Sequence, residues 1–125
     1  MPDFTEAGPT LPASDMGRAR AFYEQTLGLK SVDENPGGVT YQVGSSLIFV
    51  YPSEFAGTNQ ATAATLMVAD VEAAVEELRG KGLTFHDYDF PGLKTENGIA
   101  DLGGEKSAWF TDSEGNIISV AERTA

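Results

Sequence analysis

The sequence contains no cysteine, so it can form no disulfide framework, no thiolate nucleophile and no thiolate metal site. Basic residues are also few: 8 lysines and arginines stand against 19 aspartates and glutamates, for a formal net charge of −11. Nucleic acids and anionic membrane surfaces both require a basic footprint, so neither is expected as a partner. The charge is compatible with a cationic ligand, or simply with a well-solvated acidic surface.

Long hydrophobic runs are missing as well. No apolar stretch approaches the roughly 20 residues that a membrane-spanning helix needs. The opening residues, MPDFTEAGPT, lack both the basic and the apolar segment of a signal peptide. A soluble cytoplasmic protein is therefore expected. At 125 residues, of which 41% are hydrophobic, the chain can build one compact domain around a core.

One pattern occurs twice along the chain. In each copy a leucine lies four positions before an aspartate, apolar residues follow at helical spacing, and glycine ends the run. Asp15 and Asp70 are expected to cap two helices, because a carboxylate accepts from the free N–H groups of a first turn. Gly28 is expected to end the first helix in the left-handed conformation. The predicted helices cover residues 15–27 and 70–79.

Short runs of strand-forming residues surround each helix, separated by turn sequences. Gly44-Ser45-Ser46 predicts a hairpin with a three-residue loop. Asp112, Glu114 and Asn116 resemble one arm of a calcium loop, but they are interpreted as a hairpin turn. The segment 89–106 is expected to be a long loop that serves as a lid or as a dimer contact. The predicted strands cover residues 10–13, 30–32, 39–43, 47–51, 65–68, 84–88, 107–111 and 117–122.

Both halves of the chain therefore follow the order β-α-β-β-β, and the expected fold class is α+β. Residues 1–125 are expected to form a single domain, with module one at 8–52 and module two at 63–123. Since a half of this size buries little apolar surface alone, the two modules should pair their sheets into a curved cup. Such a concave surface is a natural ligand site.

The segments ASDMGRARAFYEQTLGL and AWFTDSEGNIISVAE, together with the repeat, resemble the vicinal oxygen chelate superfamily. This superfamily includes glyoxalases, bleomycin-resistance proteins and extradiol dioxygenases. The resemblance extends from Thr10 to Glu122 and implies two paired β-α-β-β-β modules. It also implies cups that are often completed across a homodimer, and in many members a divalent metal on the floor of the cup.

The metal-ligand positions implied by this resemblance hold no suitable donors here. They correspond to Gly8, Phe49, Ala64 and Ser119, of which only the serine offers even a weak ligand. A divalent metal site needs three or four convergent donors, and the adjacent positions do not supply them. The sequence therefore predicts no metal and no other cofactor.

Aromatic side chains are expected to line the floor of the cup instead. If Val43 faces Leu47 and Thr111 faces Ile117 across their turns, alternation places a set of side chains on the face of the vacant positions. Aromatic rings suit planar or cationic organic ligands, although each ring is equally compatible with a place in the core. The predicted ligand-binding residues are Tyr41, Phe49, Tyr51, Trp109 and Ser119.

Two functions from different classes are compatible with this pattern. The first is a metal-independent protein that binds and sequesters a small planar or cationic compound, such as an antibiotic. The second is a lyase, isomerase or dioxygenase of the same superfamily. It would use either a metal held by carboxylates elsewhere in the chain, or a metal-free mechanism with His86 or an acidic residue as its acid or base. A lone histidine beside two carboxylates is more commonly an ordinary surface residue, so no catalytic residue is assigned.

Overall fold

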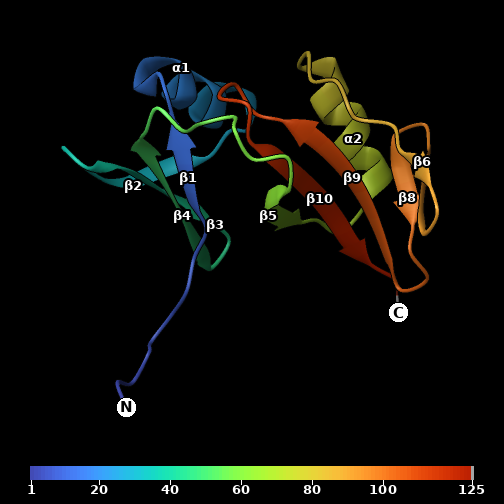
Figure 1. The fold of residues 1–125 in the computed structure, drawn as a ribbon, viewed down its shortest axis with the longest axis horizontal. Helices are drawn as coiled ribbons and strands as arrows, with labels where there is room; N and C mark the ends of the chain where they lie inside the picture. Colours follow the sequence, from blue (N-terminus) through green and yellow to red (C-terminus); the bar gives the residue numbers. More distant parts are fainter. Residues whose placement is uncertain (125) are drawn as a thin grey trace.

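The computed structural model describes residues 1–124, which form two modules side by side (Figure 1). Module one contains β1 (Thr10–Ala13), α1 (Met16–Ala21), the π-helix η1 (Phe22–Thr26), β2 (Lys30–Asn35), β3 (Gly38–Val43) and β4 (Ser46–Pro52). Module two contains β5 (Thr62–Met67), α2 (Val71–Gly80), β6 (Asp89–Phe90), β7 (Leu93–Glu96), β8 (Ile99–Asp101), β9 (Glu105–Thr111) and β10 (Ile117–Arg123). The predicted α+β class is confirmed. Within the described residues, no helix is long and apolar enough to cross a bilayer.

Each module has its own mixed sheet. The strand order is β1-β4-β3-β2 in module one and β5-β10-β9-β8-β7-β6 in module two. In both modules the first strand runs parallel to the last one, and their registers correspond. Thr10 faces Phe49 in module one, and Thr65 faces Ser119 in module two. The repeat seen in the sequence is therefore a repeat of topology.

Both helices begin where the sequence predicts. The side chain of Asp15 accepts from the N–H of Arg18, and that of Asp70 accepts from the N–H of Ala73. These bonds confirm the two N-caps. The chain leaves the first helical segment through Gly28, whose φ of 69° is costly for any other residue.

Helices cover one face of each sheet, and the apolar core lies beneath them. In module one, Tyr41 and Val50 are buried on this helical face, together with Tyr23 of η1. In module two, Phe110 and Ile118 are buried in the same way. Side chains alternate along a strand, so the residues between these positions point to the opposite side. We call this opposite side the open face of each sheet.

Two stretches of module two differ from the prediction. The expected strand 84–88 is reduced to a single bridge between Phe85 and Phe110. The expected loop 89–106 instead contains β6, β7 and β8. The signal for a hairpin is present at Asn97 and Gly98, whose φ values of 55° and 81° suit the tight turn between β7 and β8. The glycine-rich composition of the segment hid these short strands.

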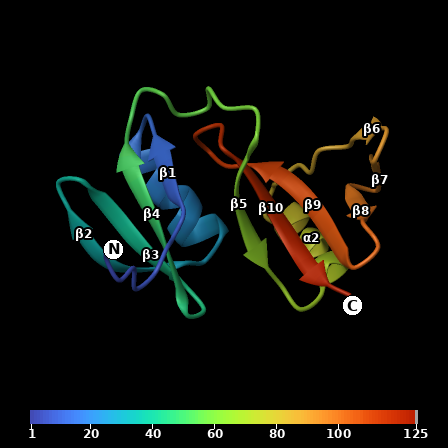
Figure 2. The same cartoon turned by 60° about the horizontal axis from the view of Figure 1, so that its bottom comes forward.

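A buried carboxylate joins the two modules. No strand of one module pairs with a strand of the other among residues 1–124, but the β9–β10 turn reaches toward module one (Figure 2). The side chain of Glu114 in this turn is 0% exposed. It accepts from the backbone N–H of Asp15 at 2.9 Å and from Nε of Arg18 at 2.7 Å.

Two further residues of the same turn bind module one. Asp112 accepts from the hydroxyl of Tyr23 at 2.5 Å, and Asn116 donates to the carbonyl of Pro12 at 2.8 Å. We call this set of contacts the intermodule clamp: Asp112, Glu114 and Asn116 on one side, and Pro12, Asp15, Arg18 and Tyr23 on the other. The predicted hairpin turn is present, but its polar side chains are buried and hold the modules together.

The clamp changes the acidity of its groups. Burial alone would raise the pKa of Glu114, but hydrogen bonds from Arg18, the Asp15 N–H and Ser113 outweigh it and lower the pKa to about 2. Burial, reinforced by the neighbouring Asp112 carboxylate, raises the pKa of Tyr23 well above its ordinary value. Glu114 is therefore ionised and Tyr23 is neutral near neutral pH.

Replacing Glu114 with glutamine is expected to lower the free energy of unfolding by about 1–3 kcal/mol, because the charge-assisted bonds of the clamp are lost. A lowered pKa stabilises the fold above the ordinary value of 4.5, and the benefit disappears as pH falls through about 2. The difference between parent and Glu114→Gln should therefore be complete above roughly pH 5 and shrink toward pH 2. Urea titrations at several pH values measure it.

Lys106→Ala is the control, because it removes only the exposed pair between Lys106 and Glu72, whose atoms lie 3.4 Å apart. It should change the free energy of unfolding by less than about 0.5 kcal/mol. Equal losses in the two variants, or a Glu114→Gln loss that does not depend on pH, would contradict the role given to the clamp.

Candidate functional site

The open face of module two is centred on Trp109. On β9 and β10, Trp109 faces Ser119 and Thr111 faces Ile117, so the predicted register of this hairpin is confirmed. Trp109 is half-buried and Ser119 is buried, at 4% exposed. The hydroxyl of Ser119 lies 2.6 Å from that of Thr65 on β5. An indole ring and a pair of hydroxyl groups therefore share this face.

A row of rings extends from Trp109 across the same face. The segment preceding β6 is held against β9, because the N–H of His86 donates to the carbonyl of Trp109 at 2.8 Å. The Tyr88 ring then meets the Trp109 ring edge to face, with centroids 5.4 Å apart. Tyr88 also contacts His86 at 6.1 Å and Phe90 at 5.9 Å. We call these four residues the aromatic row.

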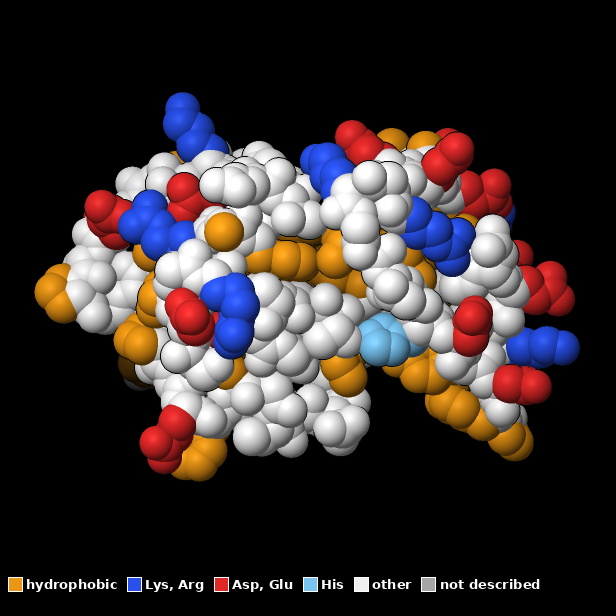
Figure 3. Space-filling model, turned by 90° about the horizontal axis from the view of Figure 1, so that it is seen from above, with side chains coloured by type: hydrophobic (Ala, Val, Ile, Leu, Met, Phe, Trp, Pro, Cys, Tyr) orange, Lys and Arg blue, Asp and Glu red, His pale blue; other side chains and the backbone are white. Residues whose placement is uncertain are grey.

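His86 has a defined polar partner on this face. Its Nε2 lies 2.7 Å from the hydroxyl of Thr111, and the side chain is half-buried. Figure 3 shows the only histidine of the chain, in pale blue, at the surface beside hydrophobic side chains. The imidazole of His86 is therefore partly exposed to solvent and also has a hydrogen-bonding partner, which an isolated surface histidine lacks.

Sequence reasoning missed Tyr88 and Phe90 as site residues. The signal was available in the alternation His86-x-Tyr88-x-Phe90, which places three rings on one side of an extended segment. That these rings meet Trp109 depends on a contact between segments about 20 residues apart. The spacing alone does not reveal such a contact.

The open face of module one carries Phe49 and Tyr51. Their rings are parallel to within 3°, with centroids 6.4 Å apart, and both are half-buried. Phe49 lies over Gly38, where an added Cβ would approach the ring to 2.9 Å and the carbonyl of Val50 to 2.3 Å. Glycine at this position therefore permits the placement of the Phe49 ring.

Tyr41 does not belong to this surface, because the predicted β3–β4 register is wrong by one residue. Val43 faces Ser46, which leaves a loop of two residues, and Tyr41 faces Ile48 instead of Phe49. A slip of one residue moves a side chain to the other side of the sheet. Tyr41 is accordingly 0% exposed on the helical face, where its ring stacks on Tyr23.

The predicted ligand-binding residues are thus divided over three places. Trp109 and Ser119 lie together on the open face of module two, and Phe49 and Tyr51 lie together on that of module one. No ring contact joins these two pairs within residues 1–124. Tyr41 lies in the core, and its hydroxyl donates to Glu24 at 2.8 Å.

The positions that would hold a metal do not fit one. Ala64 faces Ile118 on the helical face, so the open-face residue at this level is Thr65. The positions that correspond in the two sheets are therefore Thr10 with Phe49, and Thr65 with Ser119, none of which is a carboxylate or a histidine. No group of three or more His, Cys, Asp or Glu side chains converges for a metal within the described part of the chain.

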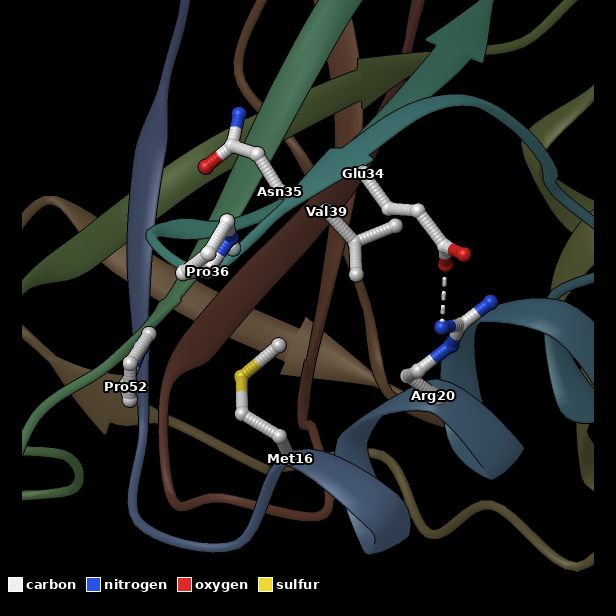
Figure 4. Close-up of a pocket in the computed structure, with 8 residues that line it drawn as sticks. Met16, Arg20, Glu34, Asn35, Pro36, Val39 and Pro52 are labelled. Atoms are coloured by element: carbon white, nitrogen blue, oxygen red, sulfur yellow. Dashed lines mark hydrogen bonds and ion pairs between the residues drawn. The ribbon is translucent and has the colours of Figure 1, made fainter.

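Two cavities lie away from the aromatic row. One of about 430 Å³ opens between α1 and the β2–β3 turn, where Met16 and Val39 lie near Pro36 and Pro52 (Figure 4). Its charged side chains, Arg20 and Glu34, already bind one another. A second cavity, of about 640 Å³, separates α2 from β7 and β8. We take the aromatic row as the candidate site because several rings and hydroxyl groups converge on it.

The sequence matches a family model described as "Glyoxalase/Bleomycin resistance protein/Dioxygenase superfamily" over residues 7–120. A comparison with curated proteins finds no match. Solved structures with the same fold include UcmS2, with 18% identity and a TM-score of 0.75, covering 95% of this chain and 98% of that protein.

Two further solved structures have names that mention a function. TnmS3, an antibiotic-binding protein from Streptomyces sp. CB03234, is 19% identical with a TM-score of 0.68, and the match covers 99% of each chain. A lactoylglutathione lyase from Agrobacterium tumefaciens is also 19% identical with a TM-score of 0.68, covering 97% of this chain and 95% of the lyase. At these identities the likeness concerns the fold.

The purified protein is expected to contain no stoichiometric transition metal, because the open-face positions offer two threonines, a phenylalanine and a serine. Elemental analysis after purification without added metal measures this directly. Adding Mn, Ni, Zn or Fe salts, or a chelator, should leave the melting temperature unchanged. One equivalent of metal per chain would show that carboxylates from elsewhere form a site.

Proposed function

The chain belongs to the Glyoxalase/Bleomycin resistance protein/Dioxygenase superfamily, and from this premise we propose that it binds a small planar organic compound without a metal ion. The compound lies on the open face of module two against Trp109, and the protein acts by sequestering it. The observation that carries this proposal is the aromatic row, in which Tyr88 contacts both Trp109 and His86.

The physical basis of binding is apolar area and ring electrostatics. A planar ligand that extends the row would stack on, or meet edge to face, a ring that the protein already holds in place. Because Tyr88 supports Trp109 and β9 anchors the backbone of His86, little conformational freedom is lost on binding. The antibiotic-binding protein TnmS3, which has the same fold, supports the choice of a binding role.

An enzyme of the lyase, isomerase or dioxygenase type is the alternative. The observation that favours it is the 2.7 Å contact between His86 Nε2 and the Thr111 hydroxyl on the same face as Trp109. An imidazole in that place can exchange a proton with a bound compound. Recovery of the compound chemically unchanged after prolonged incubation favours sequestration, whereas turnover that is lost in His86→Gln favours the enzyme.

We further propose that the protein is a homodimer in which a second copy covers the open faces. Within one chain, the Phe49–Tyr51 pair and the aromatic row do not touch. Bringing the open face of module one in one copy toward that of module two in the other would enclose a ligand between aromatic surfaces. Exposed apolar side chains, Leu47 at 38% and Met67 at 47% among them, are available for such an interface.

Trp109→Ala is expected to weaken binding of a planar aromatic compound by roughly tenfold or more, because it removes a stacking surface. In the parent protein the compound should quench tryptophan fluorescence saturably, and Trp109 is the only tryptophan. Calorimetry measures the affinity of the variant, which lacks the fluorophore.

Tyr41→Phe is the control for this experiment, since Tyr41 lies on the helical face. It should leave the affinity unchanged, whereas Tyr88→Ala should reduce it. If a broad panel of planar compounds produces no quenching, or if Tyr41→Phe and Trp109→Ala weaken binding equally, the proposed site is wrong.

Light scattering coupled to size-exclusion chromatography should give twice the mass of one chain at micromolar concentration. Substituting a charged residue for a side chain buried in the interface should convert the protein to monomers, and Met67→Glu is the variant we would make. Glu54→Lys, in the segment 53–61 that connects β4 to β5, is the control for altered charge. A parent protein that is monomeric throughout this concentration range would rule out the dimer.

A further inference from the structure

We infer that the compound bound at the aromatic row is uncharged and carries a hydroxyl or carbonyl oxygen that binds the Thr65–Ser119 hydroxyl pair. This inference rests on the proposed function and narrows it, because the sequence alone left both planar and cationic ligands open. It is based on two observations: the distribution of charge over the open face, and the unused hydrogen-bonding capacity of the hydroxyl pair.

The strand positions at the centre of this open face carry no charged side chain, although the chain as a whole has a net charge of −11. The nearby carboxylate of Asp87, between His86 and Tyr88, accepts from the Thr95 hydroxyl at 3.0 Å and from the Gly98 N–H at 3.1 Å. Around the Trp109–Ser119 pair, the neighbouring open-face positions on β5, β9 and β10 hold no Asp, Glu, Lys or Arg. They are occupied by Thr65, Met67, Ser107, Thr111, Ile117 and Ala121.

The nearest charged residues along these strands lie at the far end of the face. Glu105 and Arg123 face one another there, four register pairs beyond Trp109 and Ser119, and the Glu105 carboxylate accepts from the Ser107 hydroxyl at 2.9 Å. At the usual rise per residue this is roughly 13 Å away. The two residues also have opposite signs. A cation held against Trp109 would thus lose its hydration without a carboxylate of these strands directly beside it, because that of Glu105 is held at Ser107, two residues away.

The rings themselves do not form a cage for a cation. A cage requires several ring faces that surround one empty centre. Here the rings of the aromatic row pack on one another: Tyr88 meets Trp109 at 85° and lies at 23° to His86. Such a row offers an aromatic surface that one more planar ring can extend.

The Thr65–Ser119 pair supplies the polar contact. Each hydroxyl has one donor hydrogen and two acceptor lone pairs. Only one of the two hydrogens can lie between the oxygen atoms, which are 2.6 Å apart. The other hydrogen and the remaining lone pairs are free for a ligand on the exposed Thr65 side. A hydroxyl or carbonyl group on a ring stacked near Trp109 matches this capacity.

The test uses four compounds that share one ring system: 2-naphthol, 2-methylnaphthalene, 2-naphthylmethylammonium and 2-naphthoate. Quenching of Trp109 is measured at physiological ionic strength, which screens long-range attraction by the acidic surface. We expect 2-naphthol to bind about tenfold more tightly than each of the other three, as one good hydrogen bond allows. Tighter binding of the ammonium compound would overturn the inference but leave the proposed function intact.

A double variant, Thr65→Val with Ser119→Ala, tests the assigned hydroxyl groups. It should bind 2-methylnaphthalene as the parent does and lose most of the roughly tenfold preference for 2-naphthol. A double variant of exposed hydroxyls elsewhere, Ser45→Ala with Thr84→Val, should keep that preference. Ser119→Ala alone provides the test if the first double variant does not fold. A preference that persists in the Thr65 and Ser119 variants would overturn the inference, and failure of all four compounds to bind would instead refute the proposed function.

Discussion

The buried carboxylate of Glu114 is the contact on which the arrangement of the two modules depends. It sits at the tip of the β9–β10 turn, yet its partners, the N–H of Asp15 and the guanidinium of Arg18, belong to module one. Since the two sheets share no strand pairing within residues 1–124, the modules are held by this clamp and by packing around it. Phe22 of η1, for example, lies 6.3 Å from Phe110 of β9, between ring centroids.

The clamp also explains why the two open faces are available. Because α1, η1 and the β9–β10 turn occupy the helical side of the junction, the helices and the core lie on that side of both sheets. The aromatic row and the Phe49–Tyr51 pair are left on the other side. The buried polar groups of the clamp hold the modules together on the helical side. Aromatic side chains are therefore left on the open faces. The clamp and the aromatic row use different side chains, so substitution at Trp109 removes none of the clamp contacts.

The lack of metal-binding side chains and the presence of the aromatic row both support the metal-independent binding role proposed above. The family resemblance implies metal ligands at the positions of Phe49 and Ser119, and the first strand of each module brings Thr10 beside Phe49 and Thr65 beside Ser119. A phenylalanine and three hydroxyl groups cannot polarise a substrate as a metal does. They can hold one by shape, stacking and neutral hydrogen bonds. These side chains suit the binding role proposed above, and His86 on the same face suits the enzymatic alternative.

The sequence by itself determined the α+β class, both N-caps, the repeated topology and the register that places Trp109 opposite Ser119. These features depend on chemistry within a few residues, such as a carboxylate before a helix or a turn of defined length. Only the tertiary structure decided the place of Tyr41, because one residue more or less in the β3–β4 loop exchanges the two faces of a strand. It alone decided that Tyr88 meets Trp109 and that Glu114 meets Arg18. Those pairs lie about 20 and about 100 residues apart, and contacts over such separations depend on how the whole chain packs.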